Sequence, residues 1–250
     1  MKKALYATIM LTAISALAGC GSSQTQTADQ ALSDGVLVVG LNVAGDSSSY
    51  VTTDADGNTV YAGAEIEVLD ILRDNYEGLE IQYVYADSQA QLTQMLYDGQ
   101  VELAAASFTS LDAYTSQFLL SDNYTYGGLY LVGNGNAYID TLTPYADETV
   151  GISNAIPVGN LSEVPGIEVV VQSPYSDMKM LSSDIKSGIA IAGLVTEREA
   201  AELMDDTELS ITEVCGGPRV GRVFLARPGQ ESLIGVINTA ISLRYDNISK

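Results

Sequence analysis

Residues 79–106 read LEIQYVYADSQAQLTQMLYDGQVELAAA, and this stretch decides the fold class. Its first seven residues alternate between apolar and polar side chains, which is typical of a β-strand. Asp87 or Ser88 can cap a following helix whose apolar residues share one face, and Gly99 ends it. The apolar run 101–106 then predicts a buried strand. The stretch therefore predicts a strand–helix–strand unit of a parallel α/β sheet.

The same alternation continues on both sides of this stretch. Upstream, residues 36–41 predict a buried strand, residues 54–58 a turn in a polar loop, and residues 65–72 a helix. Residues 95–104 and 183–192 share a helix–Gly–strand form, which indicates two lobes of similar build. Downstream we expect strands at 129–132, 149–152, 167–171, 189–194 and 221–226, and helices at 175–185, 196–204 and 230–243.

The N-terminus has the form of an export signal. Two lysines precede an apolar run, 4–17, that is short for a membrane span of about 20 residues. The run ends in Leu17-Ala18-Gly19-Cys20, which resembles the bacterial lipobox. That resemblance implies cleavage after residues 1–19 and diacylglycerol on Cys20, with residues 20–35 as a flexible tether. An uncleaved membrane anchor is the alternative.

Composition excludes several classes of function. The net charge is −21, whereas nucleic acids and anionic lipid surfaces demand basic patches, so we expect no nucleic-acid partner. The chain has no His, which removes His-based catalysis and His-based metal sites. With Cys20 lipidated, Cys215 has no partner for a disulfide, and we expect it to be a small core residue. We expect no metal and no cofactor.

Several local motifs resemble the extracellular solute-binding proteins of polar amino acid transporters, of the family 3 type. The resemblance covers residues 36–243, and its strength is the order and spacing of motifs that are individually weak. The matching segments are Gly63-Ala64-Glu65-Ile66-Glu67, Leu96-Tyr97-Asp98-Gly99-Gln100-Val101-Glu102, Thr109, Leu120-Ser121-Asp122-Asn123-Tyr124, Gly221-Arg222-Val223-Phe224-Leu225-Ala226-Arg227 and Val236-Ile237-Asn238-Thr239-Ala240-Ile241.

The resemblance implies an α/β fold of two lobes, a periplasmic-binding-protein-like clamp in which each lobe is a mostly parallel sheet flanked by helices. Residues 36–126 and 219–250 would form lobe 1, and residues 127–218 would form lobe 2. Glycine pairs near both crossings suit a hinge, because glycine absorbs backbone rotation. The ligand would lie between the lobes at the strand ends.

The resemblance also assigns ligand-binding residues one by one. The position of the family's carboxylate-binding Arg falls on Tyr114, so a carboxylate ligand would have to recruit Arg219 or Arg222 from the return crossing. We therefore expect ordinary free amino acids to bind weakly, and a neutral, aromatic-faced or cationic solute to be preferred. Glu65 and Glu67 fit a charge preference at a helix N-terminus. The assigned residues are Tyr50 for stacking, Ser107 and Thr109 for the polar head, Tyr114, Asn154 in the anion loop, Arg219 and Arg222.

The function that these features predict is that of a binding module without chemistry. The chain would be the substrate receptor of an ABC importer for a small polar solute, with the permease subunits as its partners. It would lie outside the cytoplasm, at the cell surface or in the periplasm, held to the membrane by the acyl chains on Cys20. The alternatives are a sensory ligand-binding protein that reports to a membrane receptor, a degenerate clamp kept as a surface interaction protein, and, last, an enzyme.

Overall fold

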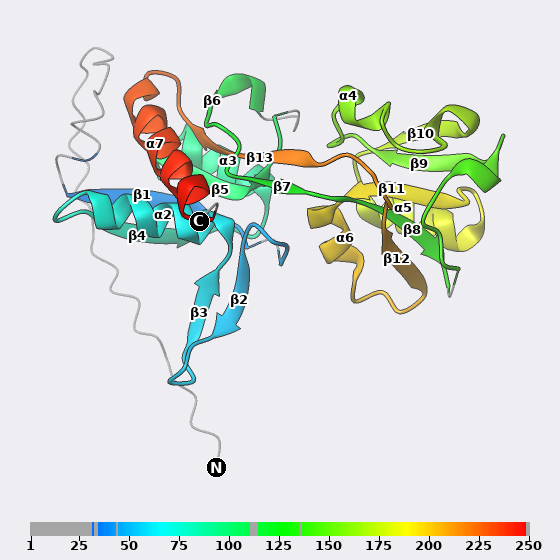
Figure 1. The fold of residues 1–250 in the computed structure, drawn as a ribbon, viewed down its shortest axis with the longest axis horizontal. Coiled ribbons are helices and arrows are strands. Elements are labelled where there is room, and N and C mark those ends of the chain that lie inside the picture. The colour runs from blue at the N-terminus through cyan, green and yellow to red at the C-terminus, as the bar shows by residue number, and fades with distance from the viewer. Residues whose placement is uncertain (1–31, 33–34, 44, 111–114, 136, 249–250) are drawn as a thin grey trace.

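The computed structural model describes residues 32, 35–43, 45–110, 115–135 and 137–248. Figure 1 shows two α/β lobes side by side, joined by two long extended segments. The chain leaves the first lobe through β7 (Thr125–Gly127) into β8 (Leu129–Asn134), and it returns from β12 (Leu209–Glu213) through β13 (Val220–Ala226). β7 and β13 pair antiparallel, so the two crossings lie together. The two-lobed α/β clamp expected from the sequence is confirmed.

The sheet of the first lobe has the order β4-β1-β5-β13-β6. β1 (Val36–Leu41) pairs in parallel with both β4 (Glu80–Tyr85) and β5 (Leu103–Phe108), whereas β13 is antiparallel to β5 and to β6 (Leu119–Leu120). Side chains alternate across the sheet. Residues 103 and 105 pack with α2 (Ala64–Asn75) and α7 (Glu231–Ile248), while 104 and 106 pack with α3 (Gln89–Tyr97) on the opposite face.

The second lobe repeats this plan with the order β10-β9-β11-β8-β12. β9 (Thr149–Ser153), β10 (Val171–Tyr175) and β11 (Ala192–Thr196) are parallel, and β8 joins β11 and β12 antiparallel. The remaining elements are α4 (Val158–Leu161), α5 (Met178–Ser187), α6 (Glu197–Leu203) and the 3-10 turns η1 (Thr115–Gln117), η2 (Thr143–Tyr145) and η3 (Ile167–Val169).

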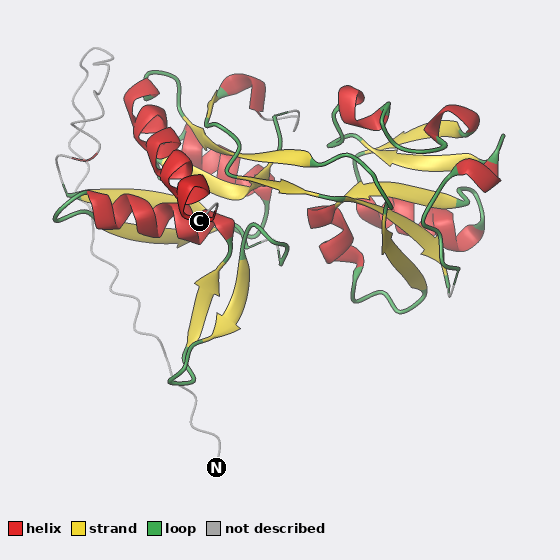
Figure 2. Ribbon diagram, viewed as in Figure 1, coloured by secondary structure: helices red, strands yellow, loops and turns green. Residues whose placement is uncertain are grey.

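Two sequence-based expectations were wrong. A strand was expected at 167–171, but residues 167–169 form η3 and the strand runs from Val171 to Tyr175. Tyr175, at which a helix was expected to begin, is therefore the last residue of this strand. Periodicity alone cannot assign such a short apolar run. The expected polar loop contains a hairpin of β2 (Tyr50–Thr53) and β3 (Thr59–Ala62), which Figure 2 shows projecting from the first lobe. β2 is wholly exposed, so it has no buried face from which to predict a strand.

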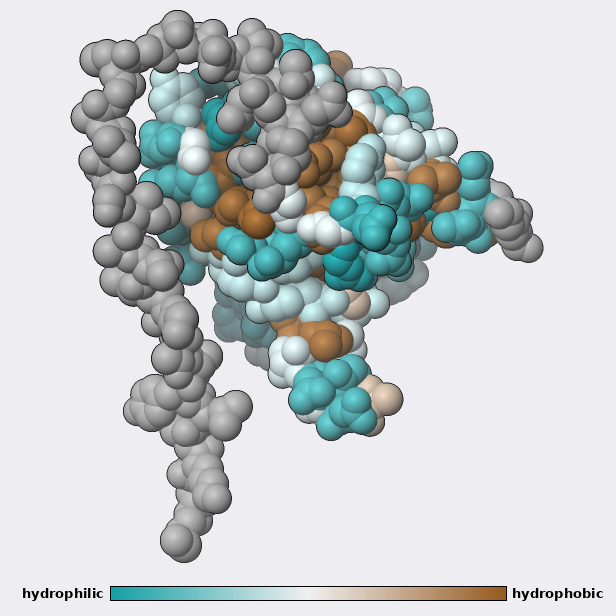
Figure 3. Space-filling view, turned by 90° about the vertical axis from the view of Figure 1, so that its left-hand side faces the viewer, coloured by the Kyte–Doolittle hydropathy of each residue, from teal (hydrophilic) through white to brown (hydrophobic). Residues whose placement is uncertain are grey.

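The outer surface of the first lobe is mixed in polarity. Figure 3 shows hydrophilic and hydrophobic residues interspersed on this end, with a hydrophilic tip on the projecting hairpin. Within the part of the chain that the structure describes, no helix is both long and apolar enough to cross a membrane. The signal segment 1–19, Cys20 and nearly all of the tether lie outside the described residues, so the predictions made for them stay predictions.

Candidate ligand-binding cleft

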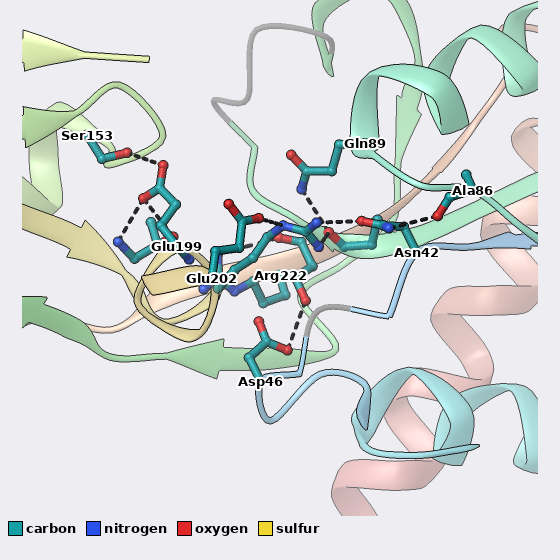
Figure 4. Close-up of polar contacts among 12 residues, drawn as sticks. Asn42, Asp46, Ala86, Gln89, Ser153, Glu199, Glu202 and Arg222 are labelled. Carbon is teal, nitrogen blue, oxygen red and sulfur yellow. Dashed lines mark hydrogen bonds and ion pairs between the residues drawn. The ribbon is translucent and has the colours of Figure 1, made fainter. Parts of the chain in front are cut away.

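A polar cavity of about 410 Å³ lies between the two lobes. It sits where Ser107 near the end of β5, Thr196 at the end of β11 and Ser176 just after β10 come together. The carboxyl ends of strands in open α/β sheets are where such folds bind ligands. Figure 4 shows Glu199, Glu202 and Arg222 in this region, between Ser153 of the second lobe and Asn42 of the first. The lining residues are Gln89, Ser107, Thr109, Ala155, Ser176, Asp177, Met178, Lys179, Thr196, Arg198, Glu199, Glu202 and Arg222.

Ser107 is fixed by three charged side chains from three different segments. Its N–H donates to Glu65 Oε1 at 2.7 Å, and its Oγ donates to Asp46 Oδ1 at 3.0 Å. Its carbonyl accepts from Arg222 Nη1 at 3.4 Å. The φ of Ser107 is +54°, a left-handed conformation that non-glycine residues seldom adopt and that persists only where surrounding contacts enforce it. The cavity wall at Ser107 is therefore preorganised.

Glu65 is the buried support beneath that wall. Its side chain is 0% exposed, and besides Ser107 it accepts a hydrogen bond from Tyr124 Oη at 2.5 Å. Burial raises the pKa of the Glu65 carboxyl, and the hydrogen bonds from Tyr124 and Ser107 oppose that shift. The sequence had suggested only a helix N-terminal preference for Glu65 and Glu67. That interpretation was incomplete for Glu65, whereas Glu67 forms a surface ion pair with Arg244 at 2.7 Å.

Arg222 is a buried cation at the cavity wall. It lies on the return strand β13 and is 1% exposed. Its Nε and Nη2 atoms are buried without a hydrogen-bond partner, and it forms no ion pair with any residue that the structure describes. A buried charge without a partner is unfavourable by several kcal/mol unless something pairs with it. Among the lining residues, Arg222 is therefore the one whose buried charge would gain most from pairing with a group of a ligand.

The first turn of α6 holds the two lobes together on the other side of the cavity. Arg198 Nη1 donates to the Ala106 carbonyl at 2.9 Å, and its Nη2 donates to Asn42 Oδ1. Glu197 accepts from the N–H and the hydroxyl of Ser47, at 3.2 and 3.0 Å. All of these bonds cross from lobe 2 to lobe 1. Arg198 also separates the cavity from a neighbouring hollow of about 510 Å³ that is lined by Asn42 and Asp87.

The structure brings together three of the residues assigned from the sequence and leaves three elsewhere. Ser107, Thr109 and Arg222 line the cavity. Tyr50 is 42% exposed on β2, Asn154 is exposed on a turn, and Arg219 pairs with Glu213 at 3.4 Å at the surface; none of the three lines the cavity. Tyr114 lies outside the described residues.

Sequence analysis missed the contribution of α6. Residues Thr196-Glu197-Arg198-Glu199 were assigned to a helix only, yet Thr196, Arg198 and Glu199 line the cavity. The signal was present: a Thr N-cap with Glu three residues later is a capping box, and the structure contains it. A capping box places a helix start directly after a strand end, which is where open α/β sheets bind ligands. Across the ranges that the structure describes, no group of three or more acidic or Cys residues is arranged to hold a metal.

Comparison with solved structures supports the fold. The chain is 18% identical to an amino acid ABC transporter substrate-binding protein, AbpA, from Streptococcus pneumoniae, determined with L-arginine; the match covers 86% of this chain and 91% of that one, with a TM-score of 0.56. It is 19% identical to a mutant of the protein ArgBP from T. maritima, over 88% and 93%, at 0.55. It is 18% identical to an ancestral amino acid-binding protein described as a precursor of cyclohexadienyl dehydratase, over 88% and 93%, at 0.55.

These likenesses identify the fold as that of the amino acid ABC transporter substrate-binding proteins, the fold that the resemblance implied. At identities below one fifth, they show the fold and not the ligand. The chain matches no family model and no curated protein.

Proposed function

We propose that this chain is a solute-binding receptor that holds a small polar solute between its two lobes. The observation that carries the proposal is the polar cavity of about 410 Å³, lined from both lobes at the strand ends. Its volume lies within the range of about 300–1,000 Å³ of small-molecule sites. The fold is shared with proteins whose known role is to bind amino acids for ABC transporters. The proposed role is binding without chemistry.

The finer parts of the proposal concern location and partners. We propose that the receptor is attached to the outer side of a cell membrane through acyl chains on Cys20, and that it delivers its solute to the permease subunits of an ABC importer. The support is the lipobox-like Leu17-Ala18-Gly19-Cys20 sequence together with the fold. Metabolic labelling with a palmitate analogue tests the anchor: the parent should be labelled and Cys20→Ser should not. Equal labelling of both would refute the lipid anchor.

Calorimetry on the purified protein tests solute binding, after a thermal-shift screen of small polar metabolites. A solute that raises the melting temperature should bind with a stoichiometry of one. Ala155 lines the cavity, so Ala155→Phe should fill it and abolish binding. Ala55→Phe, at the exposed hairpin tip, is the matched control and should bind as the parent does. Binding that survives Ala155→Phe would place the solute elsewhere.

One observation favours a second candidate, a clamp retained as a surface interaction protein. The hydroxyl of Thr109 donates to the carbonyl of Ala155 at 3.4 Å across the cleft, and the N–H and hydroxyl of Ser107 are bonded to the protein's own carboxylates. The donors that the resemblance assigned to a ligand are therefore engaged in the closed state. A complete absence of solute binding across the screen would favour this second candidate.

A further inference from the structure

The three acidic residues that line the cavity all serve the second lobe itself. Glu199 Oε1 accepts from the Ser153 hydroxyl at 2.6 Å, and its Oε2 accepts from the N–H and hydroxyl of Thr196 at 2.9 and 3.0 Å. Asp177 caps α5 by accepting from the N–H groups of Lys179 and Met180. Each carboxylate holds an element in place, so neither is a spare counter-charge for a ligand.

The third acid, Glu202, is paired with a cation of the cavity wall. Its Oε1 lies 3.4 Å from Arg198 Nε, one helical turn away on α6. Burial raises the pKa of the Glu202 carboxyl. Glu202 is therefore already paired within α6 and is not a spare counter-charge for a ligand.

The cations of the cavity wall differ from the acids. Each side-chain nitrogen of Arg198 has a partner, in Ala106, Asn42 or Glu202. Arg222, in contrast, has a whole edge unpaired, the one formed by Nε and Nη2. Lys179, exposed at the mouth of the cavity, forms no ion pair with any residue that the structure describes. Among the residues that line the cavity, the charges left over for a ligand are therefore positive.

Gly127 on β7 lies close to the Nε/Nη2 edge of Arg222, and both of these nitrogens are buried. A Cβ at residue 127 would lie 2.8 Å from Arg222 Nη2 and 3.3 Å from Nε, so any side chain there would obstruct this edge. Glu197 lies near the same glycine, and its Oε2 would lie 2.6 Å from the same Cβ. Glu197 nevertheless forms no described ion pair with Arg222, and both of its oxygens accept from Ser47.

We propose that the cleft selects a small organic anion that carries no ammonium group, with one carboxylate paired to the Nε/Nη2 edge of Arg222. This inference rests on the proposed receptor function and names its class of solute. The two N–H groups of that edge are parallel and match the two oxygens of a carboxylate. We take a short dicarboxylate as the matching solute, because its second acid group would be available to Lys179, which also lines the cavity. An ammonium group would enter a wall whose acids are already used and whose unpaired charges repel it.

The local arrangement overrides the charge of the whole molecule. A chain with net charge −21 attracts cations over its surface, which led the sequence analysis to favour a neutral or cationic solute. Selection inside the cavity depends instead on the few groups that contact the solute. There the unmatched group is Arg222.

Titration calorimetry of the full chain with matched solutes tests the inference. Succinate should bind at least about tenfold more tightly than aspartate, which adds an ammonium, and than succinamide, which lacks both charges. Glutarate and glutamate repeat the comparison with one more carbon. Aspartate or glutamate binding as tightly as its diacid would overturn the inference and leave the receptor function standing. If no solute of a broad polar panel binds, the receptor function falls as well.

Variants assign the effect to Arg222. Arg222→Gln should weaken succinate binding by at least about tenfold, because it removes the positive charge. Arg222→Lys should weaken it less, because it keeps the charge and loses only the bidentate pairing with the carboxylate. Arg219→Gln removes an arginine of the same strand region that does not line the cavity, and it should bind as the parent does. Circular dichroism verifies the fold of each variant. Unchanged succinate affinity in a folded Arg222→Gln protein would overturn the assignment; if that variant does not fold, the parent's preference among the matched solutes decides.

Discussion

At the residue scale, the cavity wall depends on a buried acidic residue that does not itself line the cavity. Glu65 lies behind Ser107 and fixes its N–H in a left-handed backbone conformation. A buried N–H that loses its acceptor costs about 1–3 kcal/mol. Residues of this kind are found by their burial and their partners, and the local sequence Ala64-Glu65-Ile66-Glu67 could equally open any surface helix.

The titration of Glu65 gives a pH-dependent prediction. Its pKa is raised above the ordinary value of 4.5, so the folded protein binds this proton more tightly than the unfolded chain does. The stabilisation associated with that proton is complete below pH 4.5 and is lost as the pH rises through the folded-state pKa. Glu65→Gln removes this titration, so its free energy of unfolding relative to the parent should increase as the pH rises above 4.5.

Urea denaturation at several pH values measures this difference. Glu65→Ala is the comparison variant: it leaves Ser107 N–H and the Tyr124 hydroxyl without their acceptor, so it should be less stable than the parent by about 1–3 kcal/mol throughout. A stability difference between Glu65→Gln and the parent that is independent of pH would show that Glu65 keeps an ordinary pKa.

Cys215 provides a second test at this scale. The sequence suggested a small core residue, and the structure corrects this, because Cys215 is exposed in the turn between β12 and β13. Cys215→Ser should change the free energy of unfolding by no more than about 0.5 kcal/mol, as surface substitutions do. Mass spectrometry should also show complete alkylation of Cys215 in the native protein without denaturant. Protection from alkylation would contradict the exposed position.

At the element scale, the helices lie close to the sheets because the central strands carry glycine where a helix packs. In β1, a Cβ at Gly40 would lie 2.2 Å from Leu92 of α3 and 3.2 Å from both methyl groups of Val101. All these side chains are fully buried, so the lobe has little room to adjust. The position of α3 sets the position of Gln89, which lines the cavity and donates to the Ala106 carbonyl at 2.8 Å.

Gly40→Ala should therefore destabilise the protein by about 1–3 kcal/mol through overpacking. Gly159→Ala is the matched control: a Cβ there meets nothing within 4 Å and sits in the short helix α4, so stability should be unchanged or slightly raised. Chemical denaturation of both variants measures the difference. Equal stability of Gly40→Ala and the parent would mean that α3 can shift away from β1 without loss.

At the scale of the whole molecule, α6 closes the clamp with groups of the protein alone. Arg198 and Glu197 together make four hydrogen bonds to the first lobe. Hydrogen bonds to charged groups contribute about 1.5–3 kcal/mol each. This bridge stabilises the closed state even when no solute is bound. A bound solute then shifts the equilibrium between the open and closed states only by the difference in its affinity for the two states.

Arg198→Ala should therefore open the clamp of the solute-free protein. Small-angle scattering should show a larger radius of gyration than for the parent. Arg73→Ala, which removes an exposed arginine from α2 far from the lobe contact, should leave the radius unchanged. If Arg198→Ala and the parent have the same radius, the bridge does not control closure. If the radius of gyration of the parent decreases when a solute binds, the bridge leaves the solute-free clamp partly open.

The sequence by itself determined the fold class, because periodicity is a local property. The buried run at 36–41 and the capped helix after Ser88 appear where their patterns placed them, and the buried strand expected at 101–106 runs two residues later, from Leu103 to Phe108. The order of such units, and the motif Gly63-Ala64-Glu65-Ile66-Glu67, were enough to indicate the two-lobed clamp.

Tertiary structure alone decided the cavity, because its residues come from segments far apart in the chain, from Gln89 to Arg222. Arg222 reaches Ser107 only because β13 returns from the second lobe and pairs with β5 and β7. Arg198 reaches Ala106 only because the lobes close on each other. No local pattern records which buried cation remains unpaired, since pairing depends on distances across the folded chain. That unpaired charge, rather than the net charge of the sequence, is what defines the proposed solute.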